Sequence, residues 1–323
     1  MDRATRYANP ANRVHSRGAV LTMLIKFSIV WLAGLSVTAH GVNRKPAVAV
    51  IATTEVEAYA QALAGIREQL PDAQVWDPGD EGRLRENLAK GLPALAIAVG
   101  RGAAIALERV APSQMLLVDT VVLEGDLESP GGGSSRFKTI ITVDLPPEVL
   151  LGWVGRLFPG RSRVGVIRGP MQTDAYMKAF ERAARQNGLT IEVTSCQHAR
   201  DVVEEFLKLK SRADLVWCPP NPQLYNSATL KPLLMSSLTN RLPILGFSEQ
   251  FVQAGALFGG SADFTDVGRQ TAALALRLAD NEPAPARQVA RKFHFAYNQR
   301  VARLLGVKAA LPDPPTSELL IIR

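Results

Sequence analysis

Cysteine and histidine are scarce in this chain of 323 residues, which contains two cysteines and four histidines. Only Cys196 and Cys218 could form a disulfide, and both are expected at strand ends in the second half of the chain, where the order 2-1-3 puts the first strand between them. Two strand spacings come to roughly 9.6 Å, more than the roughly 7 Å between Cα atoms that a disulfide spans. The sequence therefore predicts two buried free thiols.

The sequence also lacks the motifs of common catalytic and metal sites. The histidines beyond the N-terminal region are His40, His198 and His294, and none of them has the HExxH spacing. There is no GxSxG elbow, and Ser261 in FGGSADF has neither the strand–turn–helix context nor a plausible histidine partner. We expect no enzymatic activity, no metal and no cofactor.

Clusters of positive charge are missing as well. The formal net charge is +7, but +4 of it belongs to the first 39 residues. The remainder has no run of lysine and arginine with interleaved aromatic residues. Such runs are typical of nucleic-acid binding, so we expect no nucleic-acid partner.

The N-terminal region has the pattern of an export signal. Lys26 precedes the apolar run Phe27–Val37, which is too short to span a bilayer comfortably, and small side chains follow up to Ala39. We predict a signal peptide over residues 1–39, cleaved near Ala39, and a soluble periplasmic protein. An uncleaved membrane anchor is the alternative, and Met23 would make a more typical start than Met1.

Short apolar runs and amphipathic segments alternate along the rest of the chain. In residues 213–251, the runs Leu215–Cys218 and Ile244–Phe247 flank a helix-length segment, and each ends in a polar loop. This is a βαβ unit, and ligands bind outside the carboxyl ends of strands in such sheets. The alternation predicts an α/β fold with two doubly wound, parallel-sheet (Rossmann-like) lobes.

Several local patterns predict individual features. Thr54 is expected to cap the first helix, the fourth strand to end at Asp119-Thr120, and Lys292–Tyr297 to form an edge strand. The Pro-rich tail from Pro312 is expected to lie on the surface. The segment Ser129–Ser135 is rich in glycine but lacks the Gly-Lys-Ser/Thr end of a P-loop, so we expect a surface loop there.

Segments spread over residues 46–307 resemble, in order, the substrate-binding proteins of ABC transporters of the tryptophan/tyrosine type, which have the type I periplasmic binding protein fold. The matching segments are EAYAQALAGIREQL, AVGRGAA, RVGVIRGP with AFERAARQNGLTIEV, ADLVWCPPNPQLYNS, RLPILGFSE, AGALFGGSADFTDVGRQTAALALRLADNEP and FAYNQRVARLLGV.

The resemblance implies two lobes joined by a multi-strand hinge. Lobe one would comprise residues 46–144 and 248–285, and lobe two residues 145–247 and 286–323. The chain would cross near Val143, Phe247 and Gln288. A ligand that contacts both lobes only when they close would shift the population toward the closed state.

The loops after the strands supply the candidate ligand contacts. They are Thr53, Thr54, Glu55, Tyr59, Gly100, Arg101 and Asp119 in lobe one, and Gly169, Gln172, Asn221 and Ser248 in lobe two. Capping or turn roles would also explain Thr54, Gly169 and Ser248. Arg101 stands where the family has a small hydroxyl residue and favours an anionic group, and Asn221 lies near a position where the family commonly has an acid.

The resemblance implies a monomeric receptor that encloses a small ligand, amino-acid-like or another small carboxylate, and delivers it to a membrane ABC permease. A ligand-sensing or partner-binding module of the same fold, without a transport role, is the alternative. An enzyme is a third reading, against which the missing motifs count.

Overall fold

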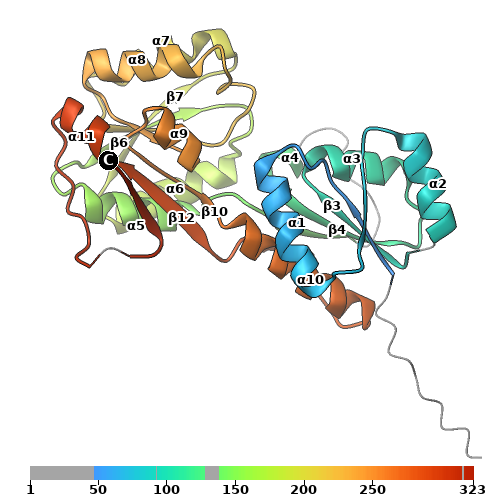
Figure 1. Ribbon diagram of the computed structural model, residues 1–323. Coiled ribbons are helices and arrows are strands. Elements are labelled where there is room, and N and C mark those ends of the chain that lie inside the picture. The colour runs from blue at the N-terminus through green and yellow to red at the C-terminus, as the bar shows by residue number, and fades with distance from the viewer. Residues whose placement is uncertain (1–46, 92, 128–137, 315) are drawn as a thin grey trace, which may run out of the picture. The chain divides into compact units, whose positions relative to one another are not determined.

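A computed structural model describes residues 47–91, 93–127, 138–314 and 316–323, which belong to one compact unit. The predicted signal peptide and the Ser129–Ser135 loop lie outside the described residues. Figure 1 shows two groups of strands with helices around each.

The first sheet has six strands, all parallel. Its central strands are short and apolar, because helices cover them on both faces. All five residues of Leu95–Val99, for example, are buried. In spatial order the strands are β11 (Arg287–Val289), β5 (Lys138–Thr142), β4 (Leu116–Val122), β3 (Leu95–Val99), β1 (Val48–Ile51) and β2 (Gln74–Trp76).

Alternate residues of each strand face opposite layers of helices. Val48 and Val50 of β1 pack toward α1 and α10, whereas Ala49 and Ile51 pack toward α2 and α3. The short α4 follows β4. The helices of this lobe are α1 (Glu57–Gln69), α2 (Glu81–Gly91), α3 (Arg101–Val110), α4 (Glu124–Leu127) and α10 (Phe264–Ala279).

Glycines allow α1 and α10 to approach closely. A Cβ on Gly65 would clash with the carbonyl oxygen of Thr265, and one on Gly268 would clash with that of Ala62. The two backbones therefore touch at these points, which fixes α10 on the first lobe although it follows the strands of the second.

The second sheet has seven strands and is mixed. Its strands β12 and β13 run parallel to each other, but β12 pairs antiparallel with β10. The remaining pairs are parallel. In spatial order the strands are β13 (Leu319–Ile322), β12 (Phe293–Asn298), β10 (Phe258–Ala262), β9 (Ile244–Gly246), β8 (Leu215–Trp217), β6 (Arg163–Arg168) and β7 (Thr190–Ser195).

Helices cover both faces of the second sheet as well. One core contains Trp217, Phe258 and Phe295 with residues of α5, α6 and α11. The opposite core contains Val216 and Ile244 with residues of α7, α8 and α9. The helices are α5 (Pro147–Leu157), α6 (Asp174–Gln186), the 3₁₀ turn Ala199–Asp201, α7 (Val202–Lys208), α8 (Leu230–Asn240), α9 (Glu249–Ala254) and α11 (Gln299–Leu305). Two sheets, each between helical layers, confirm the predicted fold class.

The free thiols are confirmed. Cys196 and Cys218 are both buried and unpaired. They follow β7 and β8, and β6 lies between these two strands in the predicted order.

Four local predictions are corrected. The fourth strand continues through Asp119 and Thr120 to Val122, because Asp119 and Thr120 pair with Ile140 and Ile141 of β5. Strand β12 is not at the edge, since the tail residues Leu319–Ile322 add β13 beside it. The tail from Pro312 was expected to lie on the surface, but its last residues form β13 of the second sheet. Helix α1 has Val56 at its N-cap position and no side-chain cap, so Thr54 does not cap it.

The chain passes between the two sheets near residues 143–146, 262–264 and 289–293. The crossings expected near Val143 and Gln288 lie at or next to the first and third passages, whereas the one expected near Phe247 corresponds to none of the three. Helix α9 packs on the second sheet, and β10 is one of its strands, although both lie in the 248–285 segment predicted for lobe one. Conversely, β11 belongs to the first sheet, although its residues lie in the 286–323 segment predicted for lobe two. Below, the first lobe means the first sheet with its helices and the second lobe the second sheet with its helices.

Candidate functional site

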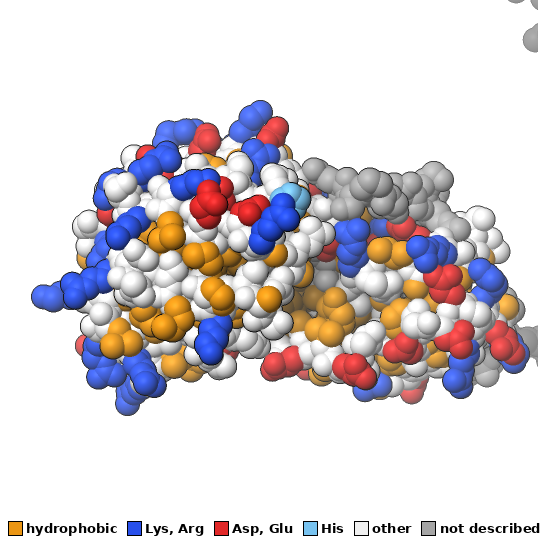
Figure 2. All heavy atoms as spheres, turned by 90° about the horizontal axis from the view of Figure 1, so that it is seen from above, with side chains coloured by type: hydrophobic (Ala, Val, Ile, Leu, Met, Phe, Trp, Pro, Cys, Tyr) orange, Lys and Arg blue, Asp and Glu red, His pale blue; other side chains and the backbone are white. Residues whose placement is uncertain are grey.

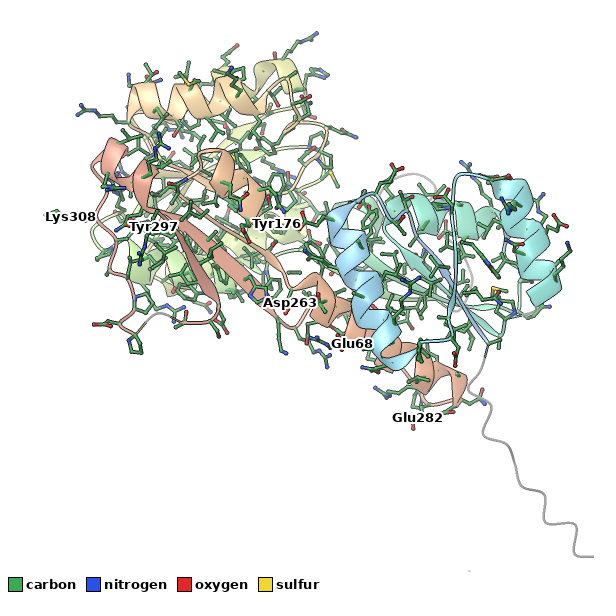
Figure 3. All side chains as sticks on the ribbon, in the orientation of Figure 1. Glu68, Tyr176, Asp263, Glu282, Tyr297 and Lys308 are labelled. Carbon is green, nitrogen blue, oxygen red and sulfur yellow. The ribbon has the colours of Figure 1, made fainter. Side chains whose placement is uncertain are left out.

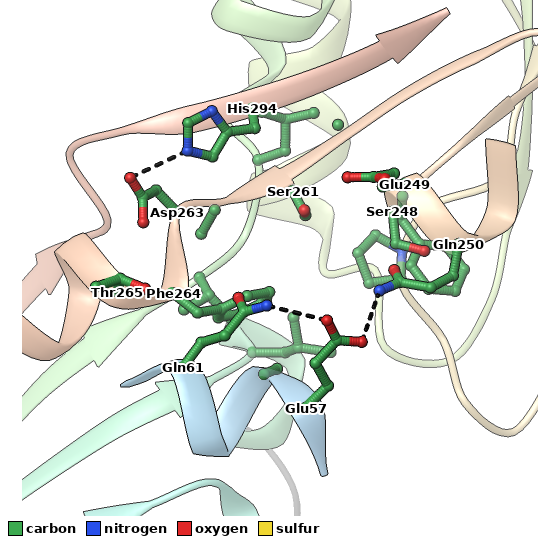
Figure 4. A pocket seen from close by; sticks show the side chains of 18 of the residues that line it. Glu57, Gln61, Ser248, Glu249, Gln250, Ser261, Asp263, Phe264, Thr265 and His294 are labelled. Atoms are coloured by element: carbon green, nitrogen blue, oxygen red, sulfur yellow. Dashed lines mark hydrogen bonds and ion pairs between the residues drawn. The ribbon is translucent and has the colours of Figure 1, made fainter. Parts of the chain in front are cut away.

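A cavity of about 720 Å³ is lined by residues of both lobes (Figure 4). Its volume is within the range of small-molecule sites. The first lobe contributes the start of α1 and the start of α10, and the second lobe contributes α9, β10, β12 and the loop after β8. We call this space the interlobe cavity. Its residues are Glu57, Ala58, Gln61, Leu123, Val143, Leu145, Pro220, Asn221, Pro222, Phe247, Ser248, Glu249, Gln250, Gln253, Gly260, Ser261, Ala262, Asp263, Phe264, Thr265 and His294.

Strand ends position much of this lining. Leu123 follows β4, Val143 follows β5, and Phe247 follows β9. The carboxyl ends of parallel strands are the usual ligand edge of an open α/β sheet. The cavity therefore lies where the βαβ pattern of the sequence predicted convergent loops.

Two of the eleven predicted contacts, Asn221 and Ser248, line the interlobe cavity. Ser248 caps α9, since its Oγ accepts a hydrogen bond of 3.1 Å from Phe251 N. Asn221 is fully buried, and its Oδ1 accepts hydrogen bonds from the backbone N–H groups of Gln223 and Leu224. These bonds fix the amide so that Nδ2 lies against Gly169, where a Cβ would collide with it. Nδ2 has no hydrogen-bond partner among the described residues.

Gln172 and Gly169 hold two second-lobe loops together instead of lining the cavity. Gly169 N donates to Gln172 Oε1 at 3.0 Å, and Gln172 Nε2 donates to Pro220 O at 3.1 Å. These bonds tie the loop after β6 to the loop after β8. Their role is to shape the wall that carries Asn221.

Arg101 and Asp119 line a different space, of about 260 Å³, on the first lobe. Arg101 Nη1 forms an ion pair of 2.8 Å with Asp126 Oδ1. Lys138 pairs with Asp119 at 2.7 Å and also with Glu108. Burial opposes the charge of Lys138, but the two carboxylates together raise its pKa. Arg101 is thus engaged with a carboxylate of the protein and does not line the interlobe cavity.

The remaining first-lobe candidates lie apart from the interlobe cavity as well. Thr53, Thr54 and Glu55 line a shallow space with residues 77–79 and Gly102. Tyr59 packs against Gly100, where its ring occupies the place that a Cβ would take. Burial, with Asp126 nearby, raises the pKa of Tyr59.

The charged lining of the interlobe cavity was not predicted from the sequence. Its titratable members are Glu57, Glu249, Asp263 and His294, and no lysine or arginine is among the lining residues. Glu57 lies in the first turn of α1, two residues beyond the predicted Glu55. Glu249 follows Ser248 in a polar segment that the sequence already marked as a strand end. The only signal in the sequence was the position of these residues just after strands. In the first lobe it pointed to Glu55, two residues before the lining residue Glu57.

Asp263 and His294 join two of the passages between the lobes (Figure 4). Asp263 Oδ2 lies 3.0 Å from His294 Nε2, and Asp263 N donates to Lys292 O at 2.9 Å. Asp263 also caps α10 by accepting from Asp266 N. Burial alone would raise the pKa of Asp263, but the bonds from Asp266 and His294 lower it.

His294 also provides the neighbour that Ser261 lacked in the sequence, because the two residues are directly opposite in β12 and β10. The arrangement is nevertheless not that of an activated nucleophile. No hydrogen bond joins Ser261 to His294 in the structure, and His294 Nε2 is engaged with Asp263. A serine nucleophile needs its base within hydrogen-bonding reach.

Asp144 lies at the passage near residues 143–146. Its Oδ2 accepts a hydrogen bond of 2.7 Å from Glu124 N. Burial raises the pKa of Asp144 to about 6, with Glu124 and Asp126 adding to the rise. This carboxyl group is thus less acidic than usual at a point where the lobes are joined.

Solved structures with this arrangement define the class of fold. A ligand-free, open structure of CD0873, described as a substrate binding protein with adhesive properties from Clostridium difficile, has a TM-score of 0.68 at 13% identity over 86% of this chain and 99% of that one. The ABC domain from Streptococcus pneumonia in complex with L-Trp has a TM-score of 0.61 at 16% identity over 86% and 100%. The fold is that of type I periplasmic binding proteins.

The family model "ABC transporter substrate binding protein" matches residues 151–310, which is just under half of the chain. No curated protein matches the sequence. The fold is also shared with transcription regulators, such as CcpA of Lactococcus lactis, with a TM-score of 0.52 at 13% identity over 78% of this chain and 97% of that one. Fold alone therefore does not fix the function.

Two further properties concern the described residues. None of their helices combines the length and the apolar character that crossing a membrane requires. They also contain no group of three or more His, Cys, Asp or Glu side chains arranged to hold a metal ion.

Proposed function

We propose that this protein is an exported, monomeric solute receptor that encloses a small ligand in the interlobe cavity and delivers it to a membrane ABC permease. The observation that carries the proposal is the cavity of about 720 Å³ with walls from both lobes. A ligand there would contact both lobes at once, so its binding energy would favour their closure.

Of the two ligand classes that the sequence favoured, the amino-acid-like class fits the cavity better than a simple carboxylate. The lining carries three carboxylates and no lysine or arginine. Such walls attract an ammonium group and repel an unaccompanied carboxylate. The L-Trp complex of the structurally similar ABC domain supports an amino-acid-like ligand.

A cavity-filling variant tests this proposal. Ser261 projects from β10 into the cavity (Figure 4), so Ser261→Trp should occupy the ligand's space. A library of amino acids, amines, peptides and small carboxylates is screened by thermal shift against both proteins. Ligands that bind only the folded state raise Tm, so wild type should gain several degrees with one class and the folded variant none. No shift with any class, or equal shifts for both proteins, would contradict the proposal.

A ligand-sensing or partner-binding module without transport is the second candidate. It is supported by the fold shared with transcription regulators and by the similarity to a substrate binding protein that is described as adhesive. Reconstitution with a candidate permease distinguishes the two. A transport receptor stimulates the permease in a ligand-dependent manner, whereas a sensor binds its ligand without doing so.

A further inference from the structure

The interlobe cavity has an unbalanced set of charges. Glu57, Glu249 and Asp263 are its carboxylates, and the imidazole of His294 is its one potential cation among the lining residues. His294 is already paired with Asp263 at 3.0 Å. The two glutamates are therefore the charges that remain without a counterpart in the cavity wall.

Neutral amides hold both glutamates. Glu57 accepts from Gln61 Nε2 at 3.1 Å and from Gln250 Nε2 at 3.3 Å. Glu249 accepts from Gln253 Nε2 at 2.7 Å. Within the described residues, neither carboxylate has a lysine, arginine or histidine nitrogen in ion-pair range.

Helix α1 also contains a glutamate that is paired with an arginine. Glu68, near its other end, forms a bidentate pair with Arg269, with distances of 2.7 and 2.9 Å. The same helix thus pairs one glutamate with arginine and holds the cavity glutamate, Glu57, with amides alone. Amide donors orient a carboxylate without neutralising its charge, so the carboxylate can still pair with the positive group of a ligand.

Asn221 carries a buried amide nitrogen without a partner behind the cavity wall. This lining residue is 0% exposed, and its Nδ2 has no partner among the described residues. A buried donor without an acceptor costs roughly 1–3 kcal/mol. That nitrogen faces Gly169, which does not line the cavity, so its unmet bond belongs to the interior of the second lobe.

Apolar side chains make up much of the remaining lining. They include Phe247 at the end of β9 and Phe264 at the start of α10, together with Leu123, Val143 and Leu145. An aromatic ring beside a cation adds a favourable interaction. The walls therefore suit a molecule with a charged end and an apolar body.

We propose that the cavity selects a cationic ligand, an amine or guanidinium compound with an apolar part, whose positive charge pairs with Glu57 and Glu249. This inference rests on the proposed receptor function and names its ligand class. It differs from the sequence expectation that Arg101 would bind an anionic group, since Arg101 lies outside the cavity and pairs with Asp126.

The test is calorimetric titration of the purified protein with a charge series. The cations are agmatine, L-arginine and phenethylamine; L-tryptophan is the zwitterion; N-acetyl-L-tryptophan and benzoate are the anions. We expect saturable binding of at least one cation and none of the anions. Glu57→Gln and Glu249→Gln should each weaken that binding by about tenfold or more, because each removes one of the two charges that would pair with the cation.

Glu181→Gln is the matched control, since Glu181 is an exposed glutamate of α6 outside the cavity. Its binding should equal that of the wild type. Preferred binding of an anion or of the neutral-side-chain zwitterion, or cation binding that both glutamine variants retain, would overturn the inference and leave the receptor function standing. No binding by any member of the series would count against both.

Discussion

Gln250 Nε2 donates a hydrogen bond of 3.3 Å to Glu57 Oε2, although 193 residues separate the two in the sequence. Gln250 lies on α9 of the second lobe and Glu57 on α1 of the first. The bond places a neutral donor where the proposed ligand would bring a positive charge. The ligand and Gln250 are therefore competitors for the same carboxylate.

Replacing Gln250 by lysine should supply that charge from within the protein. In Gln250→Lys, an ammonium group pairs with Glu57, so we expect cation affinity to fall by about tenfold or more, measured by calorimetry. Gln186→Lys, at the exposed end of α6, adds the same charge elsewhere and should leave the affinity within about twofold. Equal affinities for both lysine variants would contradict the assignment of Glu57.

The contact between α1 and α10 should tolerate no side chain at Gly268. Gly268→Ala places a methyl group against the carbonyl oxygen of Ala62, and overpacking of this kind costs roughly 1–3 kcal/mol or more. Urea unfolding measures the loss. Gly102→Ala is the control, because no atom beyond the adjacent residues and the backbone of its own helix lies within 4 Å of the new Cβ. It should be neutral, or stabilising by up to about 1 kcal/mol through helix propensity.

The elements could be predicted from the sequence because their signals are local. Buried runs such as Leu95–Val99 and the cap Asn298, whose Oδ1 accepts from Val301 N, depend on neighbours a few residues away. The passages between lobes could not be predicted in the same way. Whether Phe258–Ala262 joins one sheet or the other depends on pairing with Phe293–Asn298, which is more than thirty residues distant.

The site was predicted less completely than the fold, for a related reason. The rule that ligands meet strand ends selected Asn221 and Ser248, which line the interlobe cavity, but it could not tell which polar groups the protein uses internally. Arg101 is paired with Asp126, and Gln172 links two loops. Only the three-dimensional contacts separate such residues from Glu57 and Glu249.

Asp144 should make stability depend on pH. Its folded-state pKa of about 6 lies above its ordinary value of 3.8, so the unfolded state loses its proton first as the pH rises. Its contribution to stability is therefore fully present below about pH 4, falls between pH 4 and 6, and stays low above pH 6. Asp144→Asn removes the ionisable group and retains an acceptor for Glu124 N.

We expect Asp144→Asn to stabilise the protein at pH 7.5 by roughly 1–3 kcal/mol, from about 1.4 kcal/mol for each unit of pKa shift. The gain should shrink toward zero near pH 4. Urea unfolding at the two pH values measures both quantities. A gain that is equal at both pH values would contradict the buried carboxyl as its cause.

The buried indole N–H of Trp217 has its hydrogen-bond acceptor in Tyr176 of α6, which Figure 3 labels. Trp217 Nε1 donates to Tyr176 Oη at 3.0 Å. Tyr176→Phe leaves that donor buried and unpaired, so we expect a loss of roughly 1–3 kcal/mol in the free energy of unfolding. In a double-mutant cycle with Trp217→Phe, the two losses should be less than additive. Additive losses would show that the hydrogen bond contributes nothing.

On the face that Figure 2 shows, lysine and arginine side chains outside the cavity lie among aspartate and glutamate side chains. Several of them pair with one another, as Arg163 does with Asp214 at 2.8 Å. Exposed pairs of this kind add little to stability, about 0–1 kcal/mol each. We therefore expect their replacement to leave ligand binding unchanged.

The most direct test of the account is the distance between the lobes with and without ligand. Arg85→Cys on α2 and Lys178→Cys on α6 place fluorescent labels on opposite lobes, and the two native thiols are buried. Single-molecule energy transfer then reports the distance distribution with and without the tightest-binding amine at saturation. The account predicts a shift of the population to shorter distances on binding. An unchanged distribution, with saturation verified by calorimetry, would contradict it.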